Sequence, residues 1–175
     1  MCDWEIFMWK WIQGSLFWLV SAGAGLVFVM FRLAFWAAHR GSGYFYFDPQ
    51  DTYHENHDGR SLPLSAKTGT FDHVLKLYVG VTQLLITVAA ASIAFGANSQ
   101  SPGAALVGAK LLLAWSIIYG VLFCALLLWR YDEYSQDVTS YTLGWYSTIV
   151  ALAFSCLVCF MLGYLVWGWG LSTRL

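Results

Sequence analysis

The chain has 175 residues, of which 59% are hydrophobic and only 11% are charged. Soluble domains usually contain about 45–50% apolar and about 25% charged residues, so this composition excludes an ordinary soluble globular protein. The formal net charge of -1 comes without a block of either sign. This argues against a nucleic-acid partner, because phosphate binding needs clustered Lys and Arg.

The first long apolar run extends from Trp11 to Phe31, and Trp4, Met8 and Trp11 precede or begin it at helical spacing. We expect this helix at about residues 9–38, with its first aromatic rings at the level of the lipid headgroups. Acidic residues stand where a secretory signal has its basic region, and no small-residue cleavage site closes the run. The first span is therefore expected to be retained.

A polar segment from His39 to Gly69 follows, and it is too short to fold alone. It contains the aromatic run Tyr44–Phe47 and the turn-forming residues Asn56–Gly59. The aromatic run has no clear helical period, so we predict that its rings lie on the membrane surface, with a short strand as the alternative.

Three further apolar runs contain no charged residue, from Leu77 to Ala97, Leu111 to Trp129 and Val138 to Thr173. About 20 apolar residues suffice to cross a hydrocarbon core as a helix. Thr70, Ser101 with Pro102, and Asp137 are the expected caps, which place these helices at about residues 71–97, 102–132 and 138–171. The expected fold class is therefore all-α: a polytopic membrane protein with four transmembrane helices in an antiparallel bundle, one membrane domain over residues 1–175.

Orientation follows from the basic residues near the ends of the spans. Arg40, Arg60, Lys67, Lys76 and Arg130 fall on one side, and Lys10, Lys110 and Arg174 fall on the other. Because cytoplasmic loops carry the excess of Lys and Arg, the loop 39–69 is predicted to be cytoplasmic in a multi-pass protein. Arg32 lies close enough to that end to extend toward the interface.

Small residues predict where the helices meet, since helices in lipid associate through close backbone approach and a few polar side chains. The fourth span carries them at intervals of four: Ser147, Ala151, Ser155, Cys159 and Gly163. The third span repeats the pattern more briefly with Ser116, Gly120 and Cys124, so these two spans are expected to pack together.

The second span has one polar and small face, with Gln83 and Thr87 followed by Ala90, Ala91 and Ala94. An unpaired amide in hydrocarbon costs several kcal/mol, so Gln83 needs a partner. That partner is expected to be another helix of the same chain, with a second subunit or water in a pore as the alternatives. The predicted helix-contact or pore-lining residues are Gln83, Thr87, Ser116, Gly120, Ser147, Ala151, Ser155, Cys159 and Gly163.

Cys156-Leu157-Val158-Cys159 resembles the CxxC pair that enzymes of the vitamin K epoxide reductase type carry on a membrane helix. The resemblance implies a thiol oxidoreductase. Such enzymes pass electrons through a second cysteine pair in a loop, and the remaining cysteines here are Cys2 and Cys124. Cysteine in a membrane helix also serves as a small packing residue, which is the interpretation we favour for Cys159.

One cluster of metal-capable side chains is present in the sequence: His54, His57, Asp58 and His73. Two imidazoles and a carboxylate suffice for zinc, and Arg60 would be available for an anionic headgroup. The spacing is not that of zinc hydrolases, and a solvated loop is the favoured explanation.

The sequence contains no nucleotide-binding or nucleophile motif. We therefore expect a non-enzymatic integral membrane protein without a cofactor, in contact with lipid and with a second copy or another membrane protein. It would act as a homo-oligomeric, pore-like module or as an accessory subunit of a membrane complex. The alternative is a membrane enzyme with an interfacial His/Asp metal site or, less favoured, a CxxC oxidoreductase.

Overall fold

The computed structural model describes residues 3–38, 44–46, 64–97, 103–135 and 140–172. Within these ranges, side chains are described at 11, 14–38, 75–96, 103–129, 144–170 and 172. The described chain contains four long helices: α1 (Asp3–Ala38), α3 (Leu64–Ala97), α4 (Ala104–Ser135) and α5 (Leu143–Ser172). Two short strands, β1 (Tyr44–Tyr46) and β2 (Ser140–Thr142), pair in antiparallel register with Tyr44 opposite Thr142.

Each long helix contains a stretch that is long and apolar enough to cross a membrane. These stretches are Gly14–Ala38, Leu75–Gly96, Ala104–Trp129 and Gly144–Gly170. The shortest has 22 residues, and a 30 Å hydrocarbon core requires about 20. The expectation of four candidate membrane-spanning helices is thus confirmed, and the described chain is helical apart from the short strand pair.

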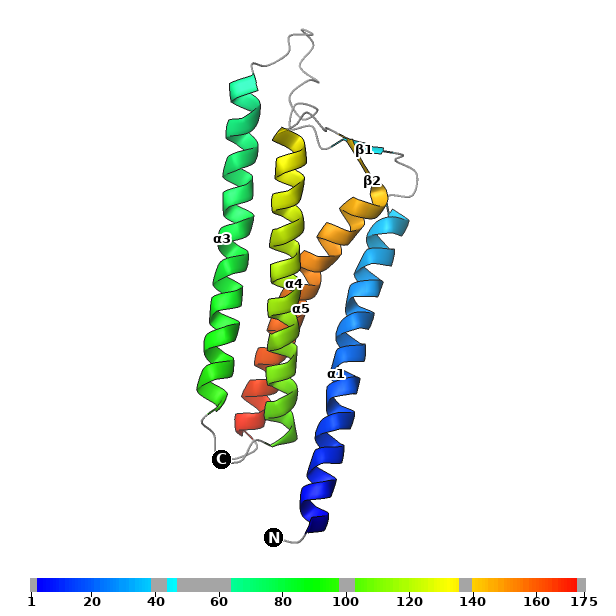
Figure 1. Ribbon diagram of the computed structural model, residues 1–175, viewed down its shortest axis with the longest axis vertical. Coiled ribbons are helices and arrows are strands. Elements are labelled where there is room, and N and C mark those ends of the chain that lie inside the picture. Colours follow the sequence, from blue (N-terminus) through cyan, green and yellow to red (C-terminus); the bar gives the residue numbers. More distant parts are fainter. Residues whose placement is uncertain (1–2, 39–43, 47–63, 98–102, 136–139, 173–175) are drawn as a thin grey trace.

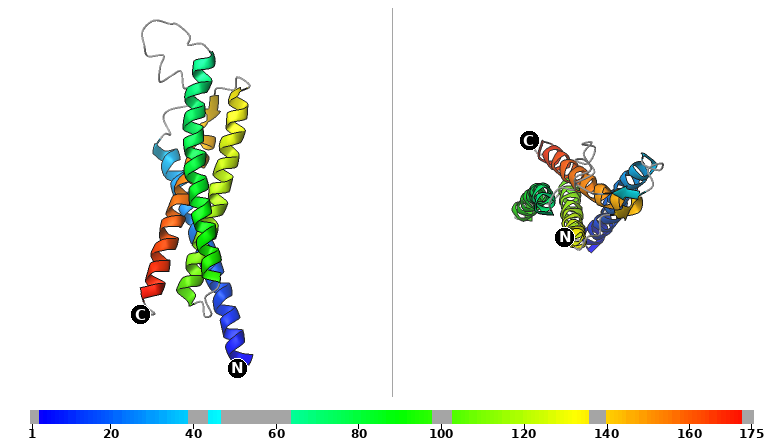
Figure 2. Two further views of the ribbon diagram at one scale, coloured as in Figure 1. Left: turned by 90° about the vertical axis from the view of Figure 1, so that its left-hand side faces the viewer. Right: turned by 90° about the horizontal axis from the view of Figure 1, so that it is seen from above.

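The helices α4 and α5 form the centre of the molecule and make its most extensive contact. Figure 1 shows α5 running obliquely behind α4, and consecutive long helices pointing in alternate directions along the long axis. Seen from above in Figure 2, α1 and α3 lie on opposite sides of this central pair. The outer helices α1 and α3 therefore each keep a broad uncovered surface.

Side-chain size is sorted between the inside and the outside of the bundle. The most completely buried residues are mostly small, such as Ala89, Ala109 and Ala151, each with an exposed fraction of 0%. Bulky apolar side chains lie on the outside, as at Phe95 and Trp169. Because lipid solvates bulky apolar groups while small ones let helices approach, this distribution suits a bundle that faces hydrocarbon.

Three helix starts differ from the sequence-based prediction. The helix α1 begins at Asp3 instead of about residue 9, and α3 begins at Leu64 instead of about residue 71. The predicted loop 39–69 was therefore wrong at its end, where residues 64–69 are helical. Pro63 precedes Leu64 in the sequence, and proline is favoured at helix starts because its fixed φ suits the first turn. The start at Leu64 also places Thr70 inside the helix and not at a cap.

The third difference is at α5, which begins at Leu143 instead of about residue 138 because Ser140–Thr142 pairs with Tyr44–Tyr46. Aromatic and β-branched residues favour strands, and the short-strand alternative for the aromatic run is the one observed. The predicted caps at Ser101, Pro102 and Asp137 lie outside the described residues. At the start of α4, the Gly103 carbonyl accepts hydrogen bonds from the amides of Leu106 and Val107.

Candidate functional site

The five small residues predicted on α5 are all buried. Ser147, Ala151, Ser155 and Cys159 have exposed fractions of at most 1%, and Gly163 is buried with them. At Gly163 the approach of α4 is close, because a Cβ atom there would lie 2.9 Å from Cγ and Cδ2 of Leu113. A side chain larger than hydrogen at this position would require the Leu113 side chain or one of the two helices to shift.

The small residues of α4 contact two different helices. Ser116 is buried against α5, where its hydroxyl donates a 2.9 Å hydrogen bond to the Cys156 carbonyl. Gly120 is also buried, but it faces α3, because a Cβ atom there would lie 3.1 Å from Cγ1 of Ile86. The helix α4 thus contacts α5 through Ser116 and α3 through Gly120.

Two aromatic side chains attach α1 to α4, and the sequence-based prediction missed both. Tyr119 donates a 2.9 Å hydrogen bond to the Ala24 carbonyl, and Trp115 Nε1 donates a 3.1 Å bond to the Ser21 hydroxyl. Phe28 stacks on Tyr119 with ring centroids 6.0 Å apart. The available signal was a pair of aromatic residues with polar tips, four positions apart in an otherwise apolar span.

At the opposite end of the helices from the strands, Lys110 and Tyr164 connect α3 to the central pair. Lys110 Nζ donates a 2.6 Å hydrogen bond to the Gly96 carbonyl in the last turn of α3. A cation at this position also offsets the negative end of the helix dipole. Tyr164 of α5 is hydrogen-bonded to Ser92 of α3. This role of Lys110 could not be predicted from the sequence, because a capping contact depends on how α3 and α4 lie relative to each other.

The inner face of α3 follows a seven-residue repeat. Leu75, Thr82, Ala89 and Gly96 are the buried residues of this helix among those described, and they are spaced seven apart. Such a repeat keeps one side of a helix against its neighbour over several turns. The Gly120 contact with Thr82 and Ile86 places α4 on that side.

A second repeat lies on the uncovered side of α3. Its residues are spaced alternately three and four apart, and we call them the outer stripe: Gly80, Gln83, Thr87, Ala90 and Ala94. All five are exposed, and a Cβ atom at Gly80 would meet nothing within 4 Å. The structure therefore separates Gln83 and Thr87 from the other predicted contact residues, which are buried between helices.

Gln83 is the polar residue of the outer stripe whose side chain lacks a hydrogen-bond partner among the described residues. Thr87 satisfies its hydroxyl by donating a 2.8 Å bond to the Gln83 backbone carbonyl. No hydrogen bond of the Gln83 side-chain amide occurs within the described part of the chain, so the expected partner on another helix of the same chain is not found there. Gln83 lies eight residues into the apolar stretch that begins at Leu75, which corresponds to a depth of about 12 Å at 1.5 Å per residue.

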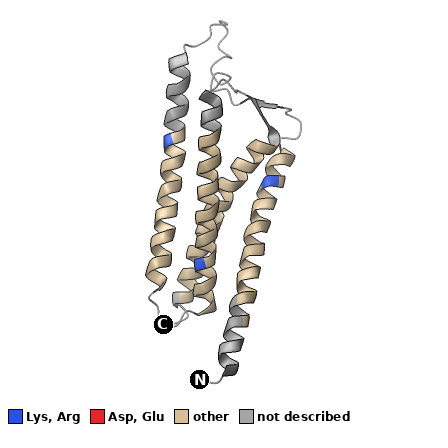
Figure 3. Ribbon diagram, in the orientation of Figure 1, with Lys and Arg blue, Asp and Glu red and all other residues tan. Residues whose placement is uncertain are grey.

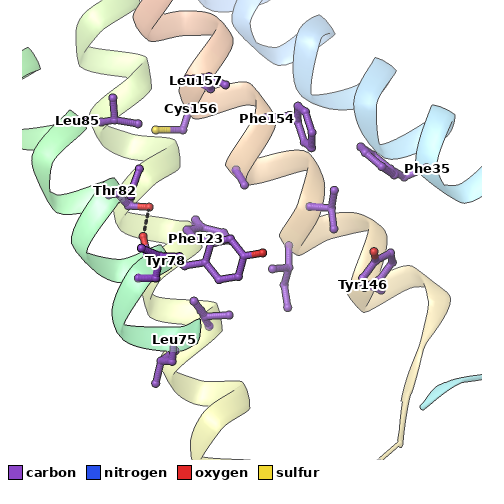
Figure 4. Close-up of a pocket in the computed structure, with 16 residues that line it drawn as sticks. Phe35, Leu75, Tyr78, Thr82, Leu85, Phe123, Tyr146, Phe154, Cys156 and Leu157 are labelled. Carbon is purple, nitrogen blue, oxygen red and sulfur yellow. Dashed lines mark hydrogen bonds between the residues drawn. The ribbon is translucent and has the colours of Figure 1, made fainter. Parts of the chain in front are cut away.

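A groove of about 690 Å³ opens between α3 and α5, with α4 as its floor. Figure 4 shows Tyr78 and Thr82 of α3 on one wall, Cys156 and Leu157 of α5 on the other, and Phe123 of α4 between them. The groove exists because α3 and α5 make few contacts with each other and diverge from the end where Ser92 meets Tyr164.

The cysteine pair of α5 lies inside the bundle. Cys156 and Cys159 have exposed fractions of 2% and 1%, and both are free thiols, as is Cys124. The Cys156 thiol lies 3.5 Å from the Ser116 hydroxyl. The structure thus places both sulfur atoms in the helix contact, with Cys156 also on the groove wall.

Most of the predicted metal ligands lie outside the residues that the structure describes. His54, His57 and Asp58 are not among the described residues, and His73 lies in α3 at a position without a described side chain. The described residues contain no group of three His, Cys, Asp or Glu side chains arranged to hold a metal ion. No family model, curated protein or solved structure matches this chain, so the geometry alone carries the functional argument.

Proposed function

We propose that this chain is a non-enzymatic integral membrane protein whose four helices cross the bilayer as an antiparallel bundle. It acts by assembling with a second copy of itself through the outer stripe of α3. The observation that carries this proposal is the Gln83 amide, which is exposed within an apolar stretch of 22 residues and has no described hydrogen-bond partner.

The energetic argument rests on the cost of leaving that amide in hydrocarbon. A buried amide without a partner costs several kcal/mol, and lipid tails offer no hydrogen bond. A glutamine side chain carries both donors and an acceptor. Two Gln83 side chains that meet across a two-fold axis can therefore satisfy each other, as the self-complementary geometry of a symmetric dimer requires.

The residues around Gln83 favour close approach of a second helix. From Gly80 to Ala94 the outer stripe extends about 21 Å along α3, most of a hydrocarbon core of about 30 Å. Three of its five members are Gly or Ala, which allow two backbones to come together. A water-lined pore would need polar groups over the whole length, so the stripe supports tight helix contact more than pore lining.

The orientation of the bundle is part of the proposal. We place the segments that connect α1 to α3 and α4 to α5 in the cytoplasm, because Arg32 and Lys76 lie toward that end of their spans. Lys110 lies toward the other end and is engaged by the Gly96 carbonyl. Basic residues near the ends of spans are retained on the cytoplasmic side.

The test is the mass of the protein in native lipid, measured after extraction of membrane discs with a polymer. The wild-type chain is expected at twice its mass of 19.6 kDa. Gln83→Leu removes the amide with little change in size and is expected to weaken the dimer about 5–30-fold, since hydrogen bonds between membrane helices contribute roughly 1–2 kcal/mol.

The matched control is the double variant Gln83→Leu, Val121→Gln, which returns an amide to an exposed position of α4 outside the stripe. It is expected to be as weak as Gln83→Leu alone. A wild-type chain that stays monomeric at all protein-to-lipid ratios contradicts the proposal. A complex with a different membrane protein in place of a second copy would contradict the homodimer. It would indicate that the chain is an accessory subunit that binds its partner through the same stripe.

A further inference from the structure

The spacing of the outer stripe restricts how two α3 helices can cross. Gly80, Gln83, Thr87, Ala90 and Ala94 follow one another at intervals of three, four, three and four residues, which is a seven-residue repeat. A straight α-helix has about 3.6 residues per turn, so a stripe of this period stays against one partner only if the two helices wrap around each other with a left-handed twist. The corresponding crossing angle is about +20°.

A right-handed crossing at the depth of Gln83 is disfavoured, because it needs small residues four apart on the approaching faces. The row that begins at Gly80 continues with Leu84 and Val88, which have exposed fractions of 62% and 38%. These bulky side chains would hold two backbones apart, whereas the seven-residue repeat avoids both of them. The buried residues on the inner face of α3, such as Ala89, already follow a seven-residue period against α4.

The depth of Gln83 sets the direction of the two helices. The middle of the apolar stretch Leu75–Gly96 falls between Leu85 and Ile86, and Gln83 precedes it by two to three residues. In an antiparallel pair of centred spans, the two Gln83 residues would lie about 8 Å apart along the helix axis. In a parallel pair they lie at the same depth, on either side of a two-fold axis along the membrane normal.

Gln83 also distinguishes one register of a parallel pair from the others. A shift by one repeat would set Gln83 of one copy against Ala90 of the other and leave both amides without a partner. That loss costs several kcal/mol in hydrocarbon. A single polar residue within an apolar helix seam is known to specify register in this way. The Thr87 hydroxyl does not compete, because it bonds to the Gln83 backbone carbonyl of its own helix.

Charge does not oppose a contact along the stripe. Figure 3 shows the described part of α3 as largely free of charge, and its charged residue there is Lys76. Lys76 precedes Gln83 by one repeat, but it is the second residue of the apolar stretch, where a long side chain extends to the aqueous surface. The five residues of the outer stripe are all uncharged.

We infer that two copies of this chain meet through α3 as a parallel, in-register pair with a left-handed crossing, in which Gln83 fixes the register. The inference rests on the proposed dimer and adds the direction, the twist and the register of its contact. Each residue of the outer stripe then faces its own counterpart in the second copy. Residues one position off the stripe, such as Ala91, face lipid.

The test of the twist is disulfide crosslinking in native membranes, with one added cysteine in each full chain and the wild-type chain as the baseline for its native cysteines. Ala90→Cys and Ala94→Cys are expected to crosslink about tenfold faster than Ala91→Cys, because a disulfide requires Cβ atoms about 3.5–4.5 Å apart. Ala91 is the matched control, since it is also an exposed alanine of α3. A right-handed crossing would bring Ala90 and Ala91 to the partner equally.

The test of the register uses two copies of different mass, one with Thr87→Cys and the other with Ala94→Cys. These positions are one repeat apart, about 10 Å along the helix, so a mixed disulfide reports a shifted pair. It is expected to be a minor product while Gln83 is present and to become comparable to the matched disulfides when both copies also carry Gln83→Leu. The ratio of mixed to matched products does not depend on how much dimer forms.

The outcomes separate this inference from the proposed dimer. Crosslinking no faster than the wild-type baseline at every position would overturn both. Equal rates for Ala90→Cys and Ala91→Cys would overturn the left-handed contact and leave the dimer standing. Mixed disulfides as abundant as matched ones with Gln83 intact would overturn its role in fixing the register.

Discussion

The α4–α5 contact and the outer stripe of α3 are built from the same kinds of residue, but the residues of the contact are buried and those of the stripe are exposed. At the α4–α5 contact, Ser116 donates to the Cys156 carbonyl and Gly163 sits directly against Leu113. On the outer stripe, Gln83 and Ala90 are exposed. Small residues with an occasional polar side chain form an observed helix contact in the first place, and we propose that they encode one with a second chain in the other.

If the outer stripe also forms a contact, a small-residue pattern specifies where a helix packs but not which helix it packs against. The chain connects α4 to α5 through a short segment, so their contact forms within one molecule. The helix α3 already uses its inner face against α4, which leaves its second repeat facing outward. The outer stripe therefore requires a partner from outside the chain if it is to be covered.

The largest effect on stability is expected from a substitution at the α4–α5 contact. Gly163→Leu places atoms where Leu113 and the Ala109 carbonyl already lie, and overpacking of this kind costs about 1–3 kcal/mol. Thermal unfolding in detergent, followed by size-exclusion chromatography after heating, should show a clearly lowered midpoint. The control is Gly168→Leu on the same helix, where a Cβ atom meets nothing within 4 Å. Equal midpoints for the two variants would show that α4 and α5 do not approach closely at Gly163.

A smaller difference in stability is expected between alanine variants of two serines at the α4–α5 contact. Ser116→Ala removes the hydrogen bond to the Cys156 carbonyl and is expected to destabilise the bundle by about 0.6–1.7 kcal/mol. Among the described residues, Ser155 is buried with no partner for its hydroxyl. Replacing an unsatisfied polar group by an apolar one is close to neutral or stabilising.

The unfolding midpoint of Ser155→Ala should therefore equal or exceed that of the wild type, while the midpoint of Ser116→Ala falls below it. The reverse order would mean that Ser155 has a hydrogen-bond partner in the folded protein. It would also mean that the Ser116 and Ser155 hydroxyls do not differ in hydrogen bonding at the α4–α5 contact.

Much of the fold could be predicted from the sequence, because the requirement to satisfy the backbone in hydrocarbon makes charge-free runs of about 20 residues helical. The helix starts outside those runs were predicted poorly. Polar residues before Leu75 gave no hydropathy signal, and the pairing of Tyr44–Tyr46 with Ser140–Thr142 joins segments far apart in the sequence.

The small residues of α5 and the polar face around Gln83 were visible as patterns at helical spacing. The groove was not, since it arises from the divergence of α3 and α5, and no single helix encodes that angle. The hydrogen bond from Tyr119 to the Ala24 carbonyl was also not predicted, because it depends on how α1 and α4 pack together. A backbone acceptor leaves no mark in the sequence.

The most direct test of self-assembly through α3 is disulfide crosslinking in native membranes. Thr87→Cys introduces a thiol into the outer stripe, and Val121→Cys introduces one at an exposed position of α4. Under mild oxidation, Thr87→Cys should form a covalent dimer rapidly, and Gln83→Leu in the same chain should slow it. A Thr87→Cys chain that crosslinks no faster than Val121→Cys would contradict the account.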